Sequence, residues 1–530
     1  MTMDKVCKLG IAAGLVFSAT PAAAQSYGTQ SFGALPHGAM PGVEAAVRAA
    51  SRGDRDLRAF YGSRGFRPLW LAGPGPSPAA IELVRLIDEA ALDGLDPASF
   101  DPDRLHELVE RAGSPRALAR ADVALSRAFV RYAAALRQPR NVGTIYLNKE
   151  LAPRIPSGGA LLAAAAAAPS LRDHVANMGW MNPIYADLRR GLATSRASRT
   201  GRAGITVPAT ATLRPGSSGA SVWYLRQRLG LPAGGAYDRA VAAAVAEFQE
   251  ARGLPVDGVA GPRTIVALNE ASPDRDGLVR LNMERARVLP ADPGRRYILV
   301  DAAGARLWMY ENGRVQDSMK VVVGKPGEAT PMLAGLMHYA IVNPYWNVPP
   351  DLARTKVAPG VLAKGVGFLK SMRYEVLSDW TDKATVLDPK TVDWRAVAAG
   401  RSEIRVRQLP GKGNSMGRMK FMMPNDLGIY LHDTPDRHLF ADANRYFSSG
   451  CVRLEDAPRL AKWLFGKPLT AASKDPEQRV DLPEPVPVYI TYLTAAPTAQ
   501  GLAFRNDVYG RDRPGAPRTE RRSAGLEPAR

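Results

Sequence analysis

The spacing of apolar residues changes near residue 295, and this change constrains the fold more than any other feature of the chain. Before it, apolar residues recur every three to four positions, as in IELVRLIDEAALDGL and ADVALSRAFVRYAAALR, which is typical of amphipathic helices. After it, short runs such as RYILVD and MKVVVG are typical of strands. A chain of 530 residues has room for three or four domains. We therefore expect a multidomain protein with an α-helical N-terminal scaffold and a β-rich C-terminal domain.

Stretches of small residues and turns suggest the boundaries between these parts. A helical scaffold is expected over 43–190, followed by a linker over 191–212 that is rich in small residues and Arg. Three amphipathic helices separated by glycine-containing turns predict a small compact domain over 213–270. The β-rich domain is expected over 295–495, with an Asn-Gly hairpin in YENGRV. A helix-containing insert over about 345–420 interrupts its strands.

The two ends of the chain are expected to lie outside these domains. Residues 1–24 have the positive start, the short apolar stretch and the small-residue cleavage site of a secretory signal peptide. The alternative is an uncleaved N-terminal anchor, although the apolar stretch is too short to span a bilayer comfortably. Residues 25–42 are expected to form a flexible leader. Residues 496–530 are basic and rich in Pro and Gly, so a disordered tail is expected there.

The formal net charge of +19 calls for an anionic partner or for solvated basic segments. The sequence contains no zinc-finger spacing, no RNP-like aromatic pattern and no basic helix, so we do not expect a nucleic acid as the partner. An exported basic protein fits anionic polymers or lipids of the cell envelope better. Much of the excess Arg lies in linkers and ends, and solvated flexible segments are an equally good explanation there.

The two cysteines, Cys7 and Cys451, suggest where the chemistry lies. Cleavage of the signal peptide would remove Cys7 and leave Cys451 without an intramolecular disulfide partner. An unpaired thiol in an oxidising compartment is either buried and inert or reactive for a purpose. Cys451 stands in YFSSGCVRLEDAPRL, after Gly450 and ahead of a predicted helix that begins at Asp456 and ends at Gly466. This setting favours a nucleophile.

A cysteine nucleophile needs a base or a cation that stabilises its thiolate. His432 ends the predicted strand GIYLH, and the loop that carries Cys451 follows it. Gly450 suits a tight turn, so the amides of Gly450 and Cys451 are candidates for an oxyanion hole. Ser448 and Ser449 would help to position the loop. Arg453 would either bind a substrate carboxylate or tie the loop to the core.

Two other interpretations of these residues remain open. A zinc ion could be held by His432, His438, Cys451 and Asp433, although their spacing matches no common zinc pattern. Alternatively, Cys451 is a buried and inert thiol. His438 lies in PDRHLF, where a surface loop is expected.

Several segments resemble those of a known family. IYLHDTP and FSSGCVRLEDAPRLAKWL resemble the catalytic core of L,D-transpeptidases with the YkuD fold, specifically the large YcbB-like branch. VVVGKPGEATPML and IVNPYWNVPPDLA resemble other parts of that domain, and LVRLNMERARVLP, within 271–294, resembles the scaffold helix that leads into it. LRAFYGSRGFRPLW resembles the N-terminal scaffold, and 213–270 resembles the three-helix peptidoglycan-binding module. The resemblance covers roughly residues 50 to 495.

Carried over residue by residue, the resemblance implies that Cys451 is the nucleophile, that His432 is its base, and that Gly450 and Cys451 form the oxyanion loop. It implies substrate-binding positions for a further set: Arg453, Tyr430, Trp346 and Ser449. Many shorter relatives have a His where Ser449 stands, but the YcbB-like branch also lacks it. Because neighbours on a strand point to opposite faces, we expect a backbone carbonyl rather than the Asp433 carboxylate to orient His432.

The resemblance implies a two-step acyl transfer on peptidoglycan in the periplasm. Cys451 would attack the carbonyl of the third residue of a tetrapeptide stem, release D-Ala and pass the acyl group to a diamino-acid side-chain amine, which gives a 3–3 cross-link. His432 would take the thiol proton, poising an ion pair, and later assist the amine. The implied partners are peptidoglycan stems and glycan strands, with carbapenems as inhibitors and an outer-membrane protein or a free D-amino acid as other acceptors. No cofactor and no metal are implied.

Two alternative functions remain open, and the insert and the small domain each suggest a role of their own. An L,D-carboxypeptidase, or another cysteine hydrolase of wall peptides, would use the same Cys/His pair with water as acceptor. A non-catalytic peptidoglycan-binding protein would be expected to have lost Cys451 or His432, and both are present. The insert at 345–420 is expected to form a lid over the cleft. The 213–270 domain is expected either to dock on glycan strands or to act as a spacer.

Overall fold

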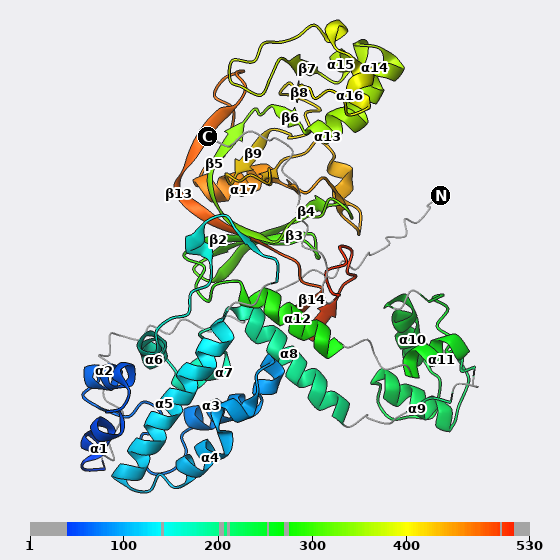
Figure 1. The fold of residues 1–530 in the computed structure, drawn as a ribbon. Coiled ribbons are helices and arrows are strands. Elements are labelled where there is room, and N and C mark those ends of the chain that lie inside the picture. The colour runs from blue at the N-terminus through cyan, green and yellow to red at the C-terminus, as the bar shows by residue number, and fades with distance from the viewer. Residues whose placement is uncertain are drawn as a thin grey trace, which may run out of the picture.

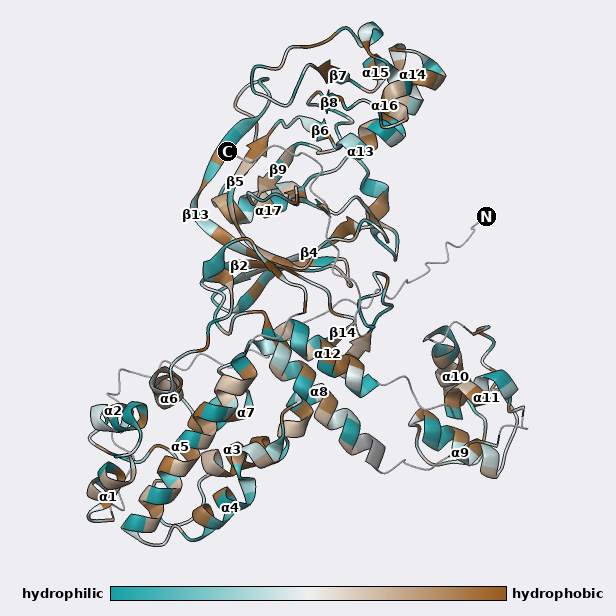
Figure 2. Cartoon of the chain, in the orientation of Figure 1, coloured by the Kyte–Doolittle hydropathy of each residue, from teal (hydrophilic) through white to brown (hydrophobic). Residues whose placement is uncertain are grey.

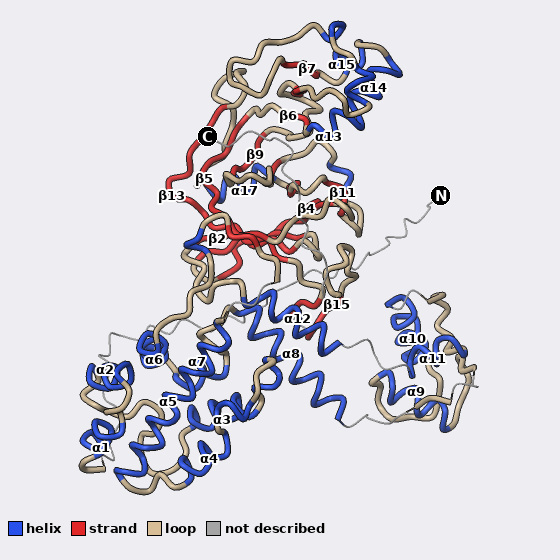
Figure 3. Tube along the Cα trace, viewed as in Figure 1, coloured by secondary structure: helices blue, strands red, loops and turns tan. Residues whose placement is uncertain are grey.

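The computed structural model describes residues 40–138, 142–200, 206–208, 212–251, 254–269, 275–498 and 501–513. Figure 1 shows a helical scaffold at one end, a small helical domain beside it, and a β-rich domain at the other end. The scaffold and the small domain contain helices and loops, whereas the strands gather in the β-rich domain together with several shorter helices (Figure 3), which confirms the expected fold class. The expected signal peptide and nearly all of the expected leader lie outside the described residues. Within the described ranges, no helix combines the length and the apolar character needed to cross a membrane.

The scaffold is organised around the long helix α5 (Pro115–Arg137). Ser114 caps its N-terminus by accepting a hydrogen bond from the Ala117 amide. Hydrophobic and hydrophilic residues alternate along it (Figure 2), and the hydrophobic stripe faces one core shared with the neighbouring helices. Those neighbours are α1 (Val43–Ala50), α2 (Arg55–Ser63), α3 (Pro78–Asp88), η1 (Ala90–Asp93), η2 (Pro97–Phe100), α4 (Pro102–Glu110), α6 (Gly158–Ala167), α7 (Leu171–Ala176) and α8 (Pro183–Thr200). The short helix η3 (Lys149–Leu151) instead packs Leu151 against residues of the large sheet.

The linker expected at 191–212 begins later than predicted, because α8 continues to Thr200. Leu192 is fully buried in the scaffold core, so packing overrides the small residues that suggested a linker. After the small domain, α12 (Arg275–Arg287) returns and packs against α8. It contributes Val279, Met283 and Ala286 to the same core.

A buried carboxylate joins these scaffold helices. Asp93 accepts hydrogen bonds from the hydroxyls of Tyr132 and Tyr185, each at 2.7 Å, and pairs with Arg189 at 2.9 Å. Arg287 of α12 donates to the Asp93 carbonyl at 2.6 Å. Both oxygens of the buried Asp93 carboxylate thus have partners, which a buried charge requires.

The small domain consists of α9 (Ala220–Leu229), α10 (Arg239–Ala251) and α11 (Pro262–Asn269). It has a hydrophobic core of its own, which includes Val222, Leu225 and Ile265. The rings of Trp223 and Tyr224 on α9 lie on its surface with their centroids 5.2 Å apart.

The β-rich domain is one sheet that closes on itself. Its order is β1-β5-β13-β2-β3-β4-β12-β10-β9, and β9 also pairs with β5. The strands are β1 (Ile145–Tyr146), β2 (Arg296–Asp301), β3 (Arg306–Glu311), β4 (Arg314–Gly324), β5 (Leu333–Val342), β9 (Met419–Met422), β10 (Leu431–His432), β11 (Tyr446–Ser448), β12 (Val452–Leu454) and β13 (Gln478–Thr491). The turn between β3 and β4 has positive φ at Asn312 and Gly313, so the Asn-Gly hairpin forms as predicted.

The helix α17 (Ala457–Phe465) packs its apolar face onto the interior of this closed sheet. Asp456 caps it by accepting from the Arg459 amide at 2.9 Å, and Gly466 ends it in the left-handed region, as the sequence predicts. The predicted strand GIYLH is shorter than expected: only Leu431 and His432 pair as a strand.

The insert folds as a unit with a core of its own. It contains a three-stranded sheet in the order β6-β8-β7, formed by β6 (Trp346–Val348), β7 (Tyr374–Leu377) and β8 (Arg405–Gln408). Its short helices are α13 (Pro350–Leu352), η4 (Ala353–Val357), α14 (Ala358–Lys364), α15 (Gly367–Ser371), η5 (Pro389–Thr391) and α16 (Trp394–Ala398).

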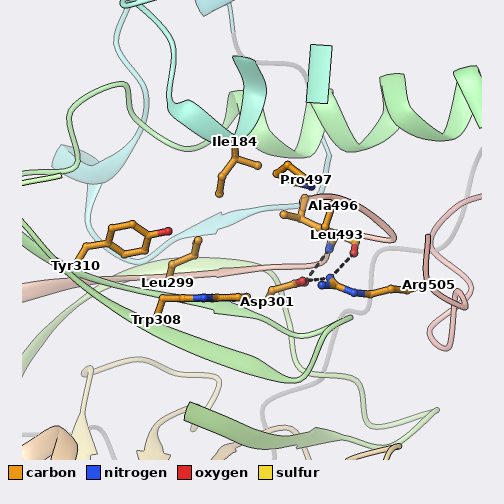
Figure 4. A pocket seen from close by; sticks show the side chains of 9 residues that line it. All are labelled: Ile184, Leu299, Asp301, Trp308, Tyr310, Leu493, Ala496, Pro497 and Arg505. Carbon is orange, nitrogen blue, oxygen red and sulfur yellow. Dashed lines mark hydrogen bonds and ion pairs between the residues drawn. The ribbon is translucent and has the colours of Figure 1, made fainter. Parts of the chain in front are cut away.

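The expectation of a disordered tail from residue 496 is wrong for the part that the structure describes. β14 (Ala495–Thr498) and β15 (Gly501–Phe504) form a hairpin that contacts α8. A small cavity of about 30 Å³ lies where α8, this hairpin and the large sheet meet (Figure 4). At its wall Asp301 accepts from the Leu493 amide at 2.9 Å and pairs with Arg505. Residues 514–530 lie outside the described residues.

Candidate active site

Cys451 lies on the loop that joins β11 to β12, at the edge of the closed sheet. Gly450 has a φ of 112°, a conformation that favours glycine. The Cys451 side chain is partly exposed, which does not fit the alternative of a fully buried, inert thiol. Its Sγ donates to the Gly428 carbonyl at 3.3 Å.

The pairing of β10 with β12 brings His432 and Cys451 to one face of the sheet. These strands are parallel, with Leu431 opposite Val452 and His432 opposite Arg453. Paired residues point to the same face, and residues two apart on a strand do so as well. Cys451 and Arg453 therefore share a face with His432, and the Val452 amide, which donates to the Tyr430 carbonyl at 3.1 Å, extends this register.

A backbone carbonyl holds the His432 ring, as the sequence predicts. Nδ1 of His432 lies 2.6 Å from the Asp433 carbonyl oxygen, so Nδ1 carries the proton of the neutral ring. Nε2 is then the nitrogen that can accept a proton. The Asp433 carboxylate is occupied elsewhere, by the Arg418 amide at 2.8 Å and by Arg437.

Burial decides the charge of His432, whose side chain is 2% exposed. Burial, the positive charge of Arg453 and that of Lys420 lower the pKa of His432 to about 3, against the hydrogen bond to Asp433. The imidazole is therefore neutral at neutral pH. The ion pair expected from the sequence is not favoured in this resting site, because a buried imidazolium beside Arg453 would be poorly solvated.

The side chain of Tyr430 also contacts Cys451. Its hydroxyl is hydrogen-bonded to Cys451, and burial, the charge of Cys451 and that of Glu477 raise the pKa of Tyr430 well above its usual range. The phenol therefore keeps its proton. Its ring lies 5.8 Å from the His432 ring, measured between centroids.

Hydrogen bonds within the loop bear on the expected oxyanion hole. Ser448 Oγ donates to the Cys451 carbonyl at 2.6 Å and accepts from the Gly450 amide at 3.2 Å. The Gly450 amide would have to give up that bond to serve an oxyanion. The Cys451 amide is the candidate that this loop geometry favours.

The other predicted substrate-binding residues lie in different parts of the domain. Arg453 pairs with Asp436 at 2.9 Å, so it ties β12 to the loop that follows β10 in this conformation. Ser449 is partly buried between Ser448 and Gly450. Trp346 lies on β6 and packs within the insert, with its ring 6.3 Å from that of Tyr374.

The residues of the zinc alternative do not gather around one point. His438 is exposed on η6 (Arg437–Phe440). In the described part of the chain, no group of three or more His, Cys, Asp and Glu side chains is placed to hold a metal ion.

One residue of the site escaped the sequence analysis. The buried hydroxyl of Thr330 accepts from the Gly324 amide and donates to the Gly450 carbonyl, each at 2.8 Å. Thr330 lies 120 residues from Gly450 in a segment quoted only for its resemblance, and no local pattern reveals such a contact.

Three family models match separate parts of the chain. Residues 295–487 match the L,D-transpeptidase catalytic domain, and residues 55–192 match a scaffold domain. Residues 223–268 match a "Putative peptidoglycan binding domain".

One curated relative and several solved structures also match parts of the chain. A Haemophilus influenzae protein named "Putative L,D-transpeptidase" is 31% identical over 240 residues, which is 44% of this chain and 47% of that protein. The chain thus spans about half the length of the curated relative that it matches. An L,D-transpeptidase structure from Mycobacterium smegmatis is 14% identical, covering 37% of this chain and 58% of that one, with a TM-score of 0.18. One from Xylanimonas cellulosilytica is 20% identical, covering 53% and 98%, with a TM-score of 0.15. TM-scores this low support no argument. By the family matches, the chain combines a scaffold domain and a peptidoglycan-binding domain with an L,D-transpeptidase catalytic domain of the YkuD type.

Proposed function

We propose that this protein is a peptidoglycan L,D-transpeptidase that uses Cys451 as its nucleophile. The observation that carries the proposal is the register of β10 and β12, which brings a partly exposed thiol and a neutral histidine to one face within the matched domain. In its neutral form the imidazole has a lone pair on Nε2 that can accept the thiol proton as the sulfur attacks.

In the first step the Cys451 sulfur attacks the carbonyl carbon of the third residue of a tetrapeptide stem, and its proton passes to Nε2 of His432. A bond from sulfur to carbon forms, and the carbonyl oxygen becomes an oxyanion that the Cys451 amide stabilises. The tetrahedral intermediate then expels the nitrogen of the terminal D-Ala, which takes the proton from His432. The products are a thioester and free D-Ala.

In the second step the side-chain amine of a diamino acid on a neighbouring stem attacks the thioester carbon and gives its proton to His432. The intermediate collapses, the bond from carbon to sulfur breaks, and the sulfur recovers the proton. The net result is a 3–3 cross-link and a regenerated thiol. Water in place of the amine would give the carboxypeptidase alternative.

The other parts of the chain support proposals of their own. The signal-like start favours export to the periplasm, and the small domain favours docking on glycan strands. A carbapenem would acylate the same sulfur, because its strained lactam presents a carbonyl to the nucleophile. An outer-membrane protein or a free D-amino acid would be alternative acceptor amines.

The insert is proposed as a lid that selects the substrate. Val348 and Val406 are paired neighbours on β6 and β8, so a short turn between them would replace the rest of the insert at little geometric cost. Such a shortened protein should still alkylate at Cys451 but lose preference among stems. Unchanged activity and preference would refute the lid.

The experiment that tests the main proposal is mass spectrometry of the intact protein after incubation with a tetrapeptide stem and, separately, with a carbapenem. Wild type should gain one acyl group and release D-Ala, whereas Cys451→Ala should gain none. His432→Gln should acylate slowly. Muropeptide analysis should then show cross-linked dimers. Shortened stems alone would indicate the hydrolase, and a folded wild type without any adduct would favour a non-catalytic binding protein.

A further inference from the structure

The peptide unit between Gly450 and Cys451 is held from the side opposite the site. It contains the Gly450 carbonyl and the Cys451 amide, which point in opposite directions because a trans peptide is planar. The hydroxyl of Thr330, which is fully buried, donates to that carbonyl at 2.8 Å. Fixing the carbonyl therefore fixes the direction of the Cys451 N–H.

Thr330 is itself held by the turn in which it lies. Its hydroxyl accepts from the Gly324 amide at 2.8 Å, so the oxygen is used both as donor and as acceptor. A Cβ at Gly324 would lie 2.1 Å from the Glu328 carbonyl oxygen, so the turn closes tightly there. The donor to Gly450 consequently has little freedom to rotate.

The C-terminal segment 505–513 closes over this turn. The Tyr509 hydroxyl donates to the Gly324 carbonyl at 2.6 Å, and Arg511 donates to the Thr330 carbonyl at 3.0 Å. The Tyr509 ring stacks on Tyr492 at 4.9 Å between centroids. The scaffold contacts the same segment, because Arg285 of α12 donates to the Arg511 carbonyl at 2.7 Å and pairs with Asp512 at 2.8 Å.

We propose that Thr330 is a positioning residue that aims the Cys451 amide at the developing oxyanion, and that Tyr509 and Arg511 hold Thr330 in place for that task. The inference rests on the proposed acyl transfer. It gives a role to a segment whose composition suggested disorder.

The test separates thiol chemistry that needs an oxyanion hole from chemistry that does not. Acylation by a tetrapeptide stem or a carbapenem builds an oxyanion, whereas alkylation by iodoacetamide displaces iodide at a saturated carbon and builds none. Both adducts form on Cys451 and are followed by mass spectrometry of the full-length protein. Each time course gives a rate constant and the fraction of protein that reacts.

Thr330→Val keeps the shape and removes the hydroxyl, and Thr330→Ser restores a hydroxyl. We expect Thr330→Val to acylate at least about tenfold more slowly, a part of the roughly 100- to 1,000-fold loss that follows removal of an oxyanion donor. Its alkylation rate and its reactive fraction should stay close to wild type. Thr330→Ser should recover most of the acylation rate.

An unchanged acylation rate in Thr330→Val would overturn the inference. So would a parallel fall in alkylation or in the reactive fraction, because Thr330 would then only support folding. Failure of wild type to acylate while still alkylating would instead refute the proposed function.

Tyr509→Phe tests the C-terminal segment with a gentler change, since it deletes only the hydroxyl. Acylation should slow and alkylation should not. Added to Thr330→Val, Tyr509→Phe should slow acylation no further. Tyr509 acts only by holding the Thr330 hydroxyl in place, and Thr330→Val has already removed that hydroxyl. If the acylation rate of the double variant fell by the product of the two single reductions, the role assigned to Tyr509 would be overturned.

Discussion

The low pKa of His432 predicts an unusual pH dependence for acylation. The rate of proton transfer from the thiol scales with the fraction of His432 that is neutral. With a pKa of about 3, almost all of the imidazole is neutral at pH 5 as well as at pH 7. An ordinary histidine of pKa 6.5 would be only about 3% neutral at pH 5, so its rate would fall about 25-fold between these two pH values.

The perturbation is therefore a change of pH from 7 to 5, and the assay is the rate constant for carbapenem acylation of Cys451 by mass spectrometry. We expect the rates at the two pH values to agree within about twofold. Circular dichroism at pH 5 would establish that the protein stays folded. A fall of about 25-fold in a folded protein would refute the reasoning, because it would mean that His432 is accessible to water or charged in the resting site.

The same pKa has a consequence for stability, with a definite sign. Between pH 6.5 and about 3 the unfolded state binds a proton at this histidine and the folded state does not. The free energy of unfolding should thus decrease as pH falls through this window, by up to about 1.4 kcal/mol per pH unit from this group. His432→Gln should remove that part of the slope, which denaturant titrations at pH 4.5 and pH 7 would measure.

Three further predictions concern other parts of the chain. Asp93→Ala should lower the free energy of unfolding of the scaffold by about 3 to 5 kcal/mol in denaturant titrations, because it leaves the buried Arg189 only its longer contact to Glu89 at 3.4 Å; a change below about 1 kcal/mol would contradict this. Tyr430→Phe should slow acylation several-fold without changing the fold, because the sulfur loses a hydrogen-bond partner; an unchanged rate constant would show that the hydroxyl is not used. Trp223→Ala and Tyr224→Ala should reduce co-sedimentation with insoluble sacculi but leave acylation by a soluble carbapenem unchanged, whereas Val256→Ala, also exposed in the small domain, serves as the matched control.

The features that the sequence predicted best depend on neighbours along the chain. The turn at Asn312 and Gly313 follows from two residues that tolerate positive φ. The cap at Asp456 and the stop at Gly466 follow from local hydrogen bonding and backbone freedom. Gly450 belongs to the same group, because its φ of 112° is a local requirement that a Gly before the nucleophile signals.

The features that the sequence could not predict depend on distant partners. Arg505 binds Asp301, which lies 204 residues away, and composition alone suggested disorder for that segment. The charge of His432 depends on how deeply β10 is buried and on Arg453 across the strand pair, neither of which periodicity reveals. The predicted start of the linker at residue 191 was wrong for the same reason. Leu192 packs into the scaffold core, so α8 continues past that position.

These long-range contacts lead from the scaffold to the nucleophile loop. Arg285 of α12 holds the C-terminal segment, that segment holds Thr330, and Thr330 holds the Gly450 carbonyl. Contiguity alone does not establish energetic coupling, because packed residues often touch without sharing two alternative arrangements. Arg285 can decide the matter, since it contacts the segment and the scaffold but belongs to neither the loop nor the turn. If the scaffold serves catalysis through this route, Arg285→Met should slow acylation more than alkylation, just as Thr330→Val should. Equal effects on both reactions would confine the scaffold to a supporting role.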